Sequence, residues 1–122
     1  MSENSKQRRR ELIREYKRTP KDMGVYRILN TANGKSYVAS SRDITARLNR
    51  HRLCLKNNME QVRALQDDWN RFGAEAFSFE VVDLLEPADK PGYNPDEDLA
   101  VLNDLWLEKL KPYGDNGYNK EP

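Results

Sequence analysis

The sequence has a single cysteine, Cys54, and no long apolar run. One cysteine excludes an internal disulfide and a cysteine-rich zinc site. The apolar runs are much shorter than the ~20 residues that a membrane-spanning helix needs. The polar, basic N-terminus lacks the apolar segment of a secretory signal. These absences predict a cytoplasmic protein with no membrane partner.

Charge of both signs is abundant, although the net charge of the 122 residues is only +1. Residues 1–63 carry 16 Lys and Arg against 6 Asp and Glu, whereas residues 64–122 carry 5 against 14. This asymmetry predicts one basic and one acidic surface. The basic surface is suited to phosphates, and a solvated surface without a partner is the alternative. The length and the mean hydropathy of −0.99 allow one domain with a modest core.

Turn signals and apolar spacing divide the chain into short elements. Asn33-Gly34 is a strong signal for a hairpin. We expect an α+β fold, in which a small, mostly antiparallel sheet is flanked by helices. The expected helices cover residues 6–18, 43–56, 60–72 and 98–110, and the expected strands cover residues 24–30, 35–40 and 77–85.

Two tyrosines in the expected hairpin are predicted to share one face of the sheet. An even-membered loop places even positions of the first strand beside odd positions of the second. Tyr26 and Ile28 then lie on the same face as Tyr37 and Ala39. Tyrosines are common in strands and often serve only for packing, which is the alternative for this pair.

The expected helix over 43–56 carries Arg47 and the only histidine, His51, four residues apart. At 100° per residue both lie at the edge of the apolar stripe, so they point toward the sheet. A snorkelling arginine and a buried structural histidine are the alternative. The candidate phosphate contacts are other arginines of the basic half: Arg10, Arg14, Arg42, Arg50 and Arg52.

Asn103 lies on the inward edge of the last expected helix, within about 40° of Leu99 and Leu110. A polar side chain there needs hydrogen-bond partners, so it either caps a structural group or faces a site. The spacing predicts that Asn103 lines one concave site with Tyr26, Tyr37, Arg47 and His51.

Together these residues resemble the GIY-YIG nuclease domain over roughly residues 23–119, which leaves residues 1–22 as a basic helical extension of a domain over residues 23–122. The first triplet of the motif is Gly24-Val25-Tyr26, and the second is Tyr37-Val38-Ala39. The other matching segments are Ser40–Asp43 with Arg47 and His51, Asp68–Asn70, Phe72-Gly73, Glu75–Phe77, Leu105–Pro112 and Gly117–Asn119.

The resemblance implies a three-stranded antiparallel sheet flanked by helices and metal-dependent hydrolysis of a DNA phosphodiester. Tyr26 would then act as the general base or position the attacking water, and Tyr37 would bind the phosphate or the water of the metal. Arg47 would stabilise the developing negative charge, with His51 assisting nearby. A cation near Tyr26 would have to lower its pKa from about 10 for base catalysis near neutral pH.

The sequence departs from the family pattern at two positions. Ala39 replaces the glycine of the second triplet. Asn103 stands where the family has a glutamate that holds the metal, and an amide brings no negative charge for Mg²⁺ or Mn²⁺. The two main functions that remain open are a nuclease with weakened activity and an inactive nucleic-acid-binding module that retains the nuclease fold. A protein-interaction domain that binds no nucleic acid is the third, and it predicts no binding to DNA at low salt.

Overall fold

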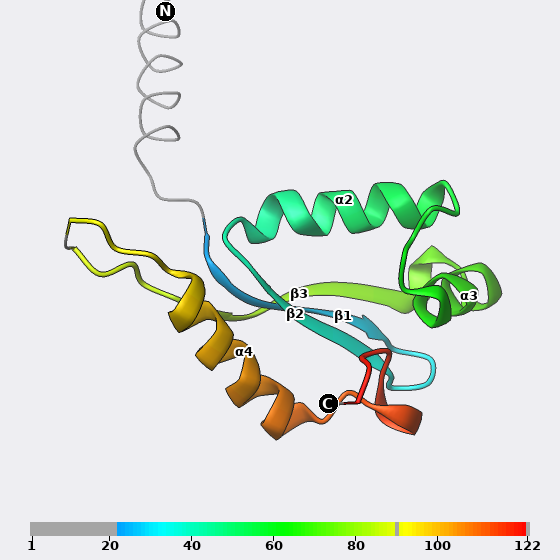
Figure 1. Cartoon of the computed structure of the whole chain (residues 1–122). Helices are drawn as coiled ribbons and strands as arrows, with labels where there is room; N and C mark the ends of the chain where they lie inside the picture. Colours follow the sequence, from blue (N-terminus) through cyan, green and yellow to red (C-terminus); the bar gives the residue numbers. More distant parts are fainter. Residues whose placement is uncertain (1–21, 90, 122) are drawn as a thin grey trace, which may run out of the picture.

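The computed structural model describes residues 22–89 and 91–121. An antiparallel sheet forms the centre of this part of the chain, with the strand order β2-β1-β3 (Figure 1). The strands are β1 (Gly24–Asn30), β2 (Ser36–Ser41) and β3 (Phe77–Leu84). The predicted α+β fold with a three-stranded antiparallel sheet is therefore confirmed. The expected helix over residues 6–18 lies outside the described residues.

The hairpin between β1 and β2 forms because short polar side chains satisfy its turn. The Asn30 side chain accepts a hydrogen bond from the Ala32 amide, and the Asn33 side chain accepts one from the Lys35 amide. Gly34 adopts φ +79°, which a residue without a Cβ reaches at little cost. The prediction from Asn33-Gly34 is confirmed.

The sheet separates two helical layers (Figure 1). Helices α2 (Ile44–Lys56) and α3 (Arg63–Phe72) pack on the face that carries Tyr26 and Ile28. Helix α4 (Asp96–Leu110) covers the opposite face. The indole of Trp106 in α4 donates to the carboxylate of Asp83, which pairs in the sheet with Val25 and so shares its face.

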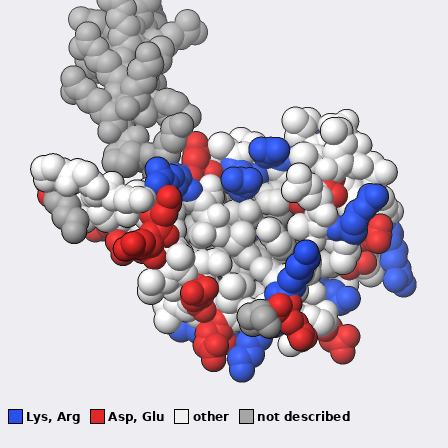
Figure 2. All heavy atoms as spheres, viewed as in Figure 1, with Lys and Arg blue, Asp and Glu red and all other residues white. Residues whose placement is uncertain are grey.

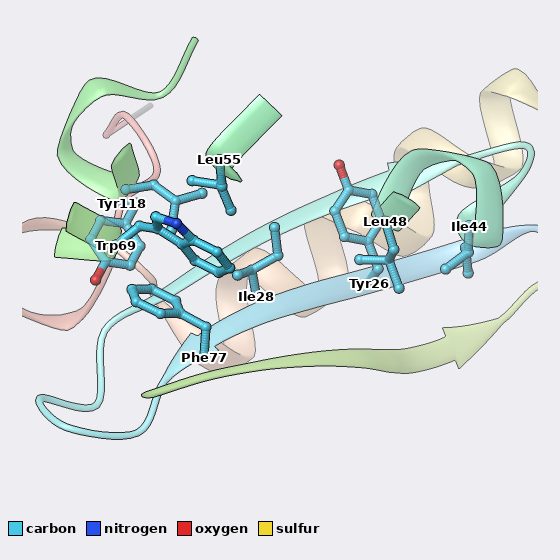
Figure 3. Packing of buried hydrophobic residues seen from close by; sticks show 9 residues of the cluster. Tyr26, Ile28, Ile44, Leu48, Leu55, Trp69, Phe77 and Tyr118 are labelled. Atoms are coloured by element: carbon cyan, nitrogen blue, oxygen red, sulfur yellow. The ribbon is translucent and has the colours of Figure 1, made fainter. Parts of the chain in front are cut away.

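The main core lies between the sheet and the layer of α2 and α3 (Figure 3). Ile28 and Leu65 are fully buried there, and the ring of Trp69 packs on that of Phe77 at 5.3 Å. Short one-turn helices at Ala74–Ala76 and Gly114–Asn116 complete the fold. Tyr26 belongs to this core, so its side chain is held by packing on several sides.

Candidate active site

A pocket of about 290 Å³ lies between the sheet and α2, and we call it the tyrosine pocket. Tyr26 and Tyr37 form its floor. The strand register pairs Tyr26 with Ala39 and Ile28 with Tyr37, which confirms that the two tyrosines share a face. Their ring centroids lie 6.4 Å apart. The full lining is Tyr26, Tyr37, Arg47, Arg50, His51, Cys54, Met59, Glu60, Gln61 and Val62.

Helix α2 supplies the wall opposite the tyrosines. The helix begins where Asp43 caps the amide of Ala46, and Ile44, Leu48 and Leu55 anchor its inner face. With these three residues facing the core, His51 faces the sheet. The centroid of its ring lies 5.6 Å from the ring centroids of Tyr26 and Tyr37. The structure therefore brings Tyr26, Tyr37, Arg47 and His51 together, as the sequence predicted.

Two hydrogen bonds connect Tyr26 to a buried carboxylate through His51. The Tyr26 hydroxyl lies 2.9 Å from His51 Nε2, and His51 Nδ1 lies 2.7 Å from Glu60 Oε1. A carboxylate can only accept, so we assign the Nδ1 proton to this bond. In neutral His51, Nε2 is then free to accept the proton of the Tyr26 hydroxyl. We call this chain the Glu60–His51–Tyr26 relay.

Glu60 is a residue of the tyrosine pocket that the sequence did not single out. We expected it at the start of a helix, but α3 begins at Arg63 and Glu60 lies in the preceding loop. There its side chain is 5% exposed, and its amide donates to the side chain of Gln66. One signal was present: Glu60 is the sole acidic residue between Asp43 and Asp67.

Both tyrosines of the pocket have a raised pKa, so their hydroxyls stay protonated to a higher pH than a free tyrosine. Burial raises the pKa of Tyr26 well above its usual value, and Tyr37 adds to the shift. Burial likewise raises the pKa of Tyr37, and the carboxylate of Glu60 adds to that shift. Arg47 acts in the opposite direction on both phenols but does not compensate. The expectation that a nearby cation lowers the pKa of Tyr26 toward neutrality is not met by the described residues.

The predicted phosphate-binding arginines occupy different surroundings. Arg50 lines the tyrosine pocket beside Arg47, and both also line a neighbouring hollow of about 610 Å³. Arg42 lies in that hollow too, where it donates to Asp96 and Asn94. The guanidinium of Arg52 instead lies 4.4 Å from the ring centroid of Phe79. Arg10 and Arg14 are outside the described residues.

The structure does not bring Asn103 into the tyrosine pocket, contrary to the expectation of one shared site. Asn103 belongs to α4, on the other side of the sheet from the two tyrosines. Its side-chain oxygen is buried and has no hydrogen-bond partner in the described part of the chain. Helical spacing correctly predicted that Asn103 faces inward, but not which face of the sheet it meets.

The described residues do not fit a divalent cation well. In residues 22–89 and 91–121, no group of three or more His, Cys, Asp or Glu side chains is placed to hold a metal. The carboxylate nearest the tyrosines, Glu60, already accepts from His51. Mg²⁺ and Mn²⁺ prefer anionic oxygen ligands. The same residues contain no helix long and apolar enough to cross a membrane.

No protein-family model and no curated protein matches the sequence significantly. Two similar solved structures contain the catalytic domain of the homing endonuclease I-TevI. One gives a TM-score of 0.65 at 26% identity and covers 82% of this chain and 99% of that chain. The other, a glutamate-to-alanine mutant of the intron endonuclease, gives the same score and identity and covers 80% and 92%. The chain therefore has the α+β fold of this endonuclease catalytic domain.

Proposed function

We propose that this protein is a nuclease of the GIY-YIG type that binds DNA at the tyrosine pocket and hydrolyses a phosphodiester bond slowly. The observation that carries the proposal is the convergence of Tyr26, Tyr37, Arg47 and His51 in one pocket. The similarity of the fold to an endonuclease catalytic domain supports it.

Arg47 is the group that holds the phosphate. Its side chain is exposed at the mouth of the pocket, and a guanidinium can donate two parallel hydrogen bonds to phosphate oxygens. The same charge stabilises the additional negative charge of the transition state. Tyr37 forms the opposite side of the pocket, where its hydroxyl can donate to the same phosphate.

The Glu60–His51–Tyr26 relay is the route by which the attacking water loses its proton. Because the pKa of Tyr26 is raised, the phenol is protonated near neutral pH and cannot itself be the resting base. Water therefore gives its proton to the Tyr26 oxygen while the Tyr26 proton passes to His51 Nε2. The hydroxide attacks phosphorus, the bond to the leaving oxygen breaks, and that oxygen takes a proton from the solvent while His51 later releases its extra proton to the solvent. The buried carboxylate of Glu60 stabilises the imidazolium that forms.

A divalent metal, which the family resemblance implies, would supply electrostatic stabilisation of the phosphate. The described residues do not provide the carboxylates for it, so no step is assigned to the metal. A reaction that depends on Arg47 and the relay alone lacks a large part of the usual stabilisation. We therefore expect slow turnover.

The second candidate function is DNA binding without hydrolysis. The specific observation in its favour is Asn103, an amide at the position of the metal-binding glutamate of the family and outside the tyrosine pocket. This function uses Arg47 and Arg50 only as contacts to phosphates.

Plasmid relaxation in the presence of Mg²⁺, Mn²⁺ or EDTA separates the two functions. The first function predicts slow nicking that Arg47→Ala and His51→Ala abolish, whereas Lys109→Ala, on the opposite face of the sheet, leaves it unchanged. Salt-sensitive DNA binding without nicking under any of the three conditions would establish the second function. Absence of DNA binding at low salt would contradict both.

A further inference from the structure

A second concavity continues from the tyrosine pocket, and we call it the Tyr37 groove. It has a volume of about 700 Å³ and shares Tyr37, Gln61 and Val62 with the pocket. The two concavities therefore meet at the side chain of Tyr37. The remaining lining residues of the groove are Arg63, Ala64, Tyr118, Asn119 and Lys120.

The walls of the Tyr37 groove include the apolar side chains of Val62 and Ala64, and the polar groups of Tyr118 and Asn119 are already hydrogen-bonded inside the protein. The Tyr118 hydroxyl donates to Asp68 at 2.6 Å and accepts from Asn30 at 3.1 Å. The Asn119 side chain makes two hydrogen bonds to the backbone of Val38, at 2.9 and 2.7 Å. The hydrogen-bonding groups of these two residues are therefore already engaged, and the apolar and aromatic part of the groove surface comes from Tyr37, Val62 and Ala64 with the edge of Tyr118.

The rim of the Tyr37 groove is positively charged. Arg63 and Lys120 are exposed lining residues, and no Asp or Glu lines the groove. Together with Arg47 and Arg50 they place cations at both ends of the joined pocket and groove. Figure 2 shows Lys and Arg side chains over α2 and again near α3 and the C-terminal segment, with a largely uncharged surface between them.

We propose that the Tyr37 groove binds an unpaired nucleotide of the DNA strand next to the phosphate held by Arg47, an inference that rests on the proposed function. Cations along a backbone path beside an aromatic surface are the chemistry that recognises single strands. A paired base is stacked on both faces and bonded at its edge, so only an unpaired base can use the apolar wall. The substrate class is therefore duplex DNA with a flap or gap beside the cleaved bond.

Fluorescence anisotropy tests the proposal with two labelled DNAs: a fully paired duplex, and a duplex of equal length with a short single-stranded flap. We expect the flapped DNA to bind the wild-type protein about tenfold more tightly, in line with the stacking of one base. Ala64→Glu and Lys120→Glu should each reduce this affinity ratio toward one. Ala64 is exposed at the start of α3, where a glutamate suits the helix.

Lys109→Glu is the matched control, because it makes the same charge change as Lys120→Glu but lies on α4. It should preserve the affinity ratio, and circular dichroism should show native folding of all variants. Equal wild-type affinity for both DNAs, or a ratio that survives in folded Lys120→Glu, would overturn the groove assignment. If the groove assignment fails but Arg47→Ala still weakens binding to the paired duplex, the proposed function is retained and only the groove assignment is lost. If neither DNA binds to the wild-type protein, both the groove assignment and the proposed function are wrong.

Discussion

The side chain of Tyr26 is buried in the core, but its hydroxyl makes a hydrogen bond outside the core. Its side chain is 2% exposed, yet its hydroxyl bonds to His51 and reaches the wall of the tyrosine pocket. The sequence allowed prediction of the neighbours of this hydroxyl on β2 and α2, because strand parity and helical spacing fix directions over short distances. It did not reveal Glu60, because a loop side chain has no periodicity from which to predict its direction.

The relay makes a prediction about the proton on His51, which is the only histidine in the chain. We expect the neutral ring to carry its proton on Nδ1, because the carboxylate of Glu60 accepts there. Nitrogen chemical shifts of the labelled imidazole measure this tautomer directly. In Glu60→Ala the population of the Nδ1–H form should fall, whereas Glu75→Ala, at an exposed position, should leave it unchanged. Equal spectra for wild type and Glu60→Ala would contradict the relay.

Arg47 and Arg52 differ in their surroundings, and this difference predicts that only Arg47 contributes to DNA binding. Arg47 lines the tyrosine pocket, whereas Arg52 packs on Phe79 and donates to Asn49. Arg47→Ala should weaken DNA binding and reduce the slope of log K against log salt by about one phosphate contact. Arg52→Ala should leave that slope unchanged. The measurement is a salt titration of DNA affinity, and a reduced slope in both variants would contradict the assignment.

At the scale of elements, the starts of α2 and α3 were predictable to different degrees. Asp43 is a strong capping residue, and it does cap α2. Helix α3 has no side-chain cap and begins at Arg63 rather than at the predicted Glu60. The Glu60 amide bonds to the side chain of Gln66, so tertiary contacts hold this segment out of the helix. Tertiary contacts of this kind cannot be predicted from the spacing of residues within one segment.

Helix α4 shows the limit of helical periodicity. The spacing of Leu99, Asn103 and Leu110 predicts which side of the helix faces inward. Whether that side packs on the sheet face that carries Tyr26 or on the opposite face depends on the path of the loop before the helix. The sequence therefore predicted the inward direction of Asn103 but wrongly placed it with the tyrosines.

The unsatisfied oxygen of Asn103 predicts that an apolar residue stabilises α4. The oxygen is buried with no partner in the described part of the chain, and a buried polar group without a hydrogen bond costs about 1–3 kcal/mol. Asn103→Leu should therefore raise the free energy of unfolding by about 1 kcal/mol. Urea denaturation measures the change, and Asp104→Leu at the exposed neighbouring position is the control. A loss of stability in Asn103→Leu would show that the amide has a structural partner.

For the whole molecule, the split of charge along the sequence is only partly a split in space. The first turn of α4 is acidic, with Asp96, Glu97 and Asp98. Arg42, from the basic half, pairs with Asp96 from the acidic half. Figure 2 shows acidic and basic side chains close together around that end of the molecule. Counting charges therefore predicted a cationic site, but not which arginines are free to bind a phosphate.

The buried tyrosines predict that the fold weakens at alkaline pH. Burial and the hydrogen bond to Asp68 raise the pKa of Tyr118 to about 12, and burial also raises that of Tyr37. Unfolded tyrosines ionise near pH 10, so above that value the unfolded state binds fewer protons and stability falls as the pH rises. Urea denaturation at several pH values should show a constant unfolding free energy up to about pH 9 and a decline above about pH 10. The decline should be shallower in Tyr118→Phe, and an unchanged slope would contradict this cause.

The two hydrogen bonds from the Asn119 side chain to Val38 have a consequence for self-association. β2 lies at one border of the sheet, where a free row of amides and carbonyls would invite another chain to add a strand. The amide group of Asn119 occupies both backbone groups of Val38, and Gly117 bridges to Ser36 beside it. The Asn119 side chain thus takes the place of a neighbouring strand at Val38 and leaves fewer free backbone groups on this border for another chain to pair with.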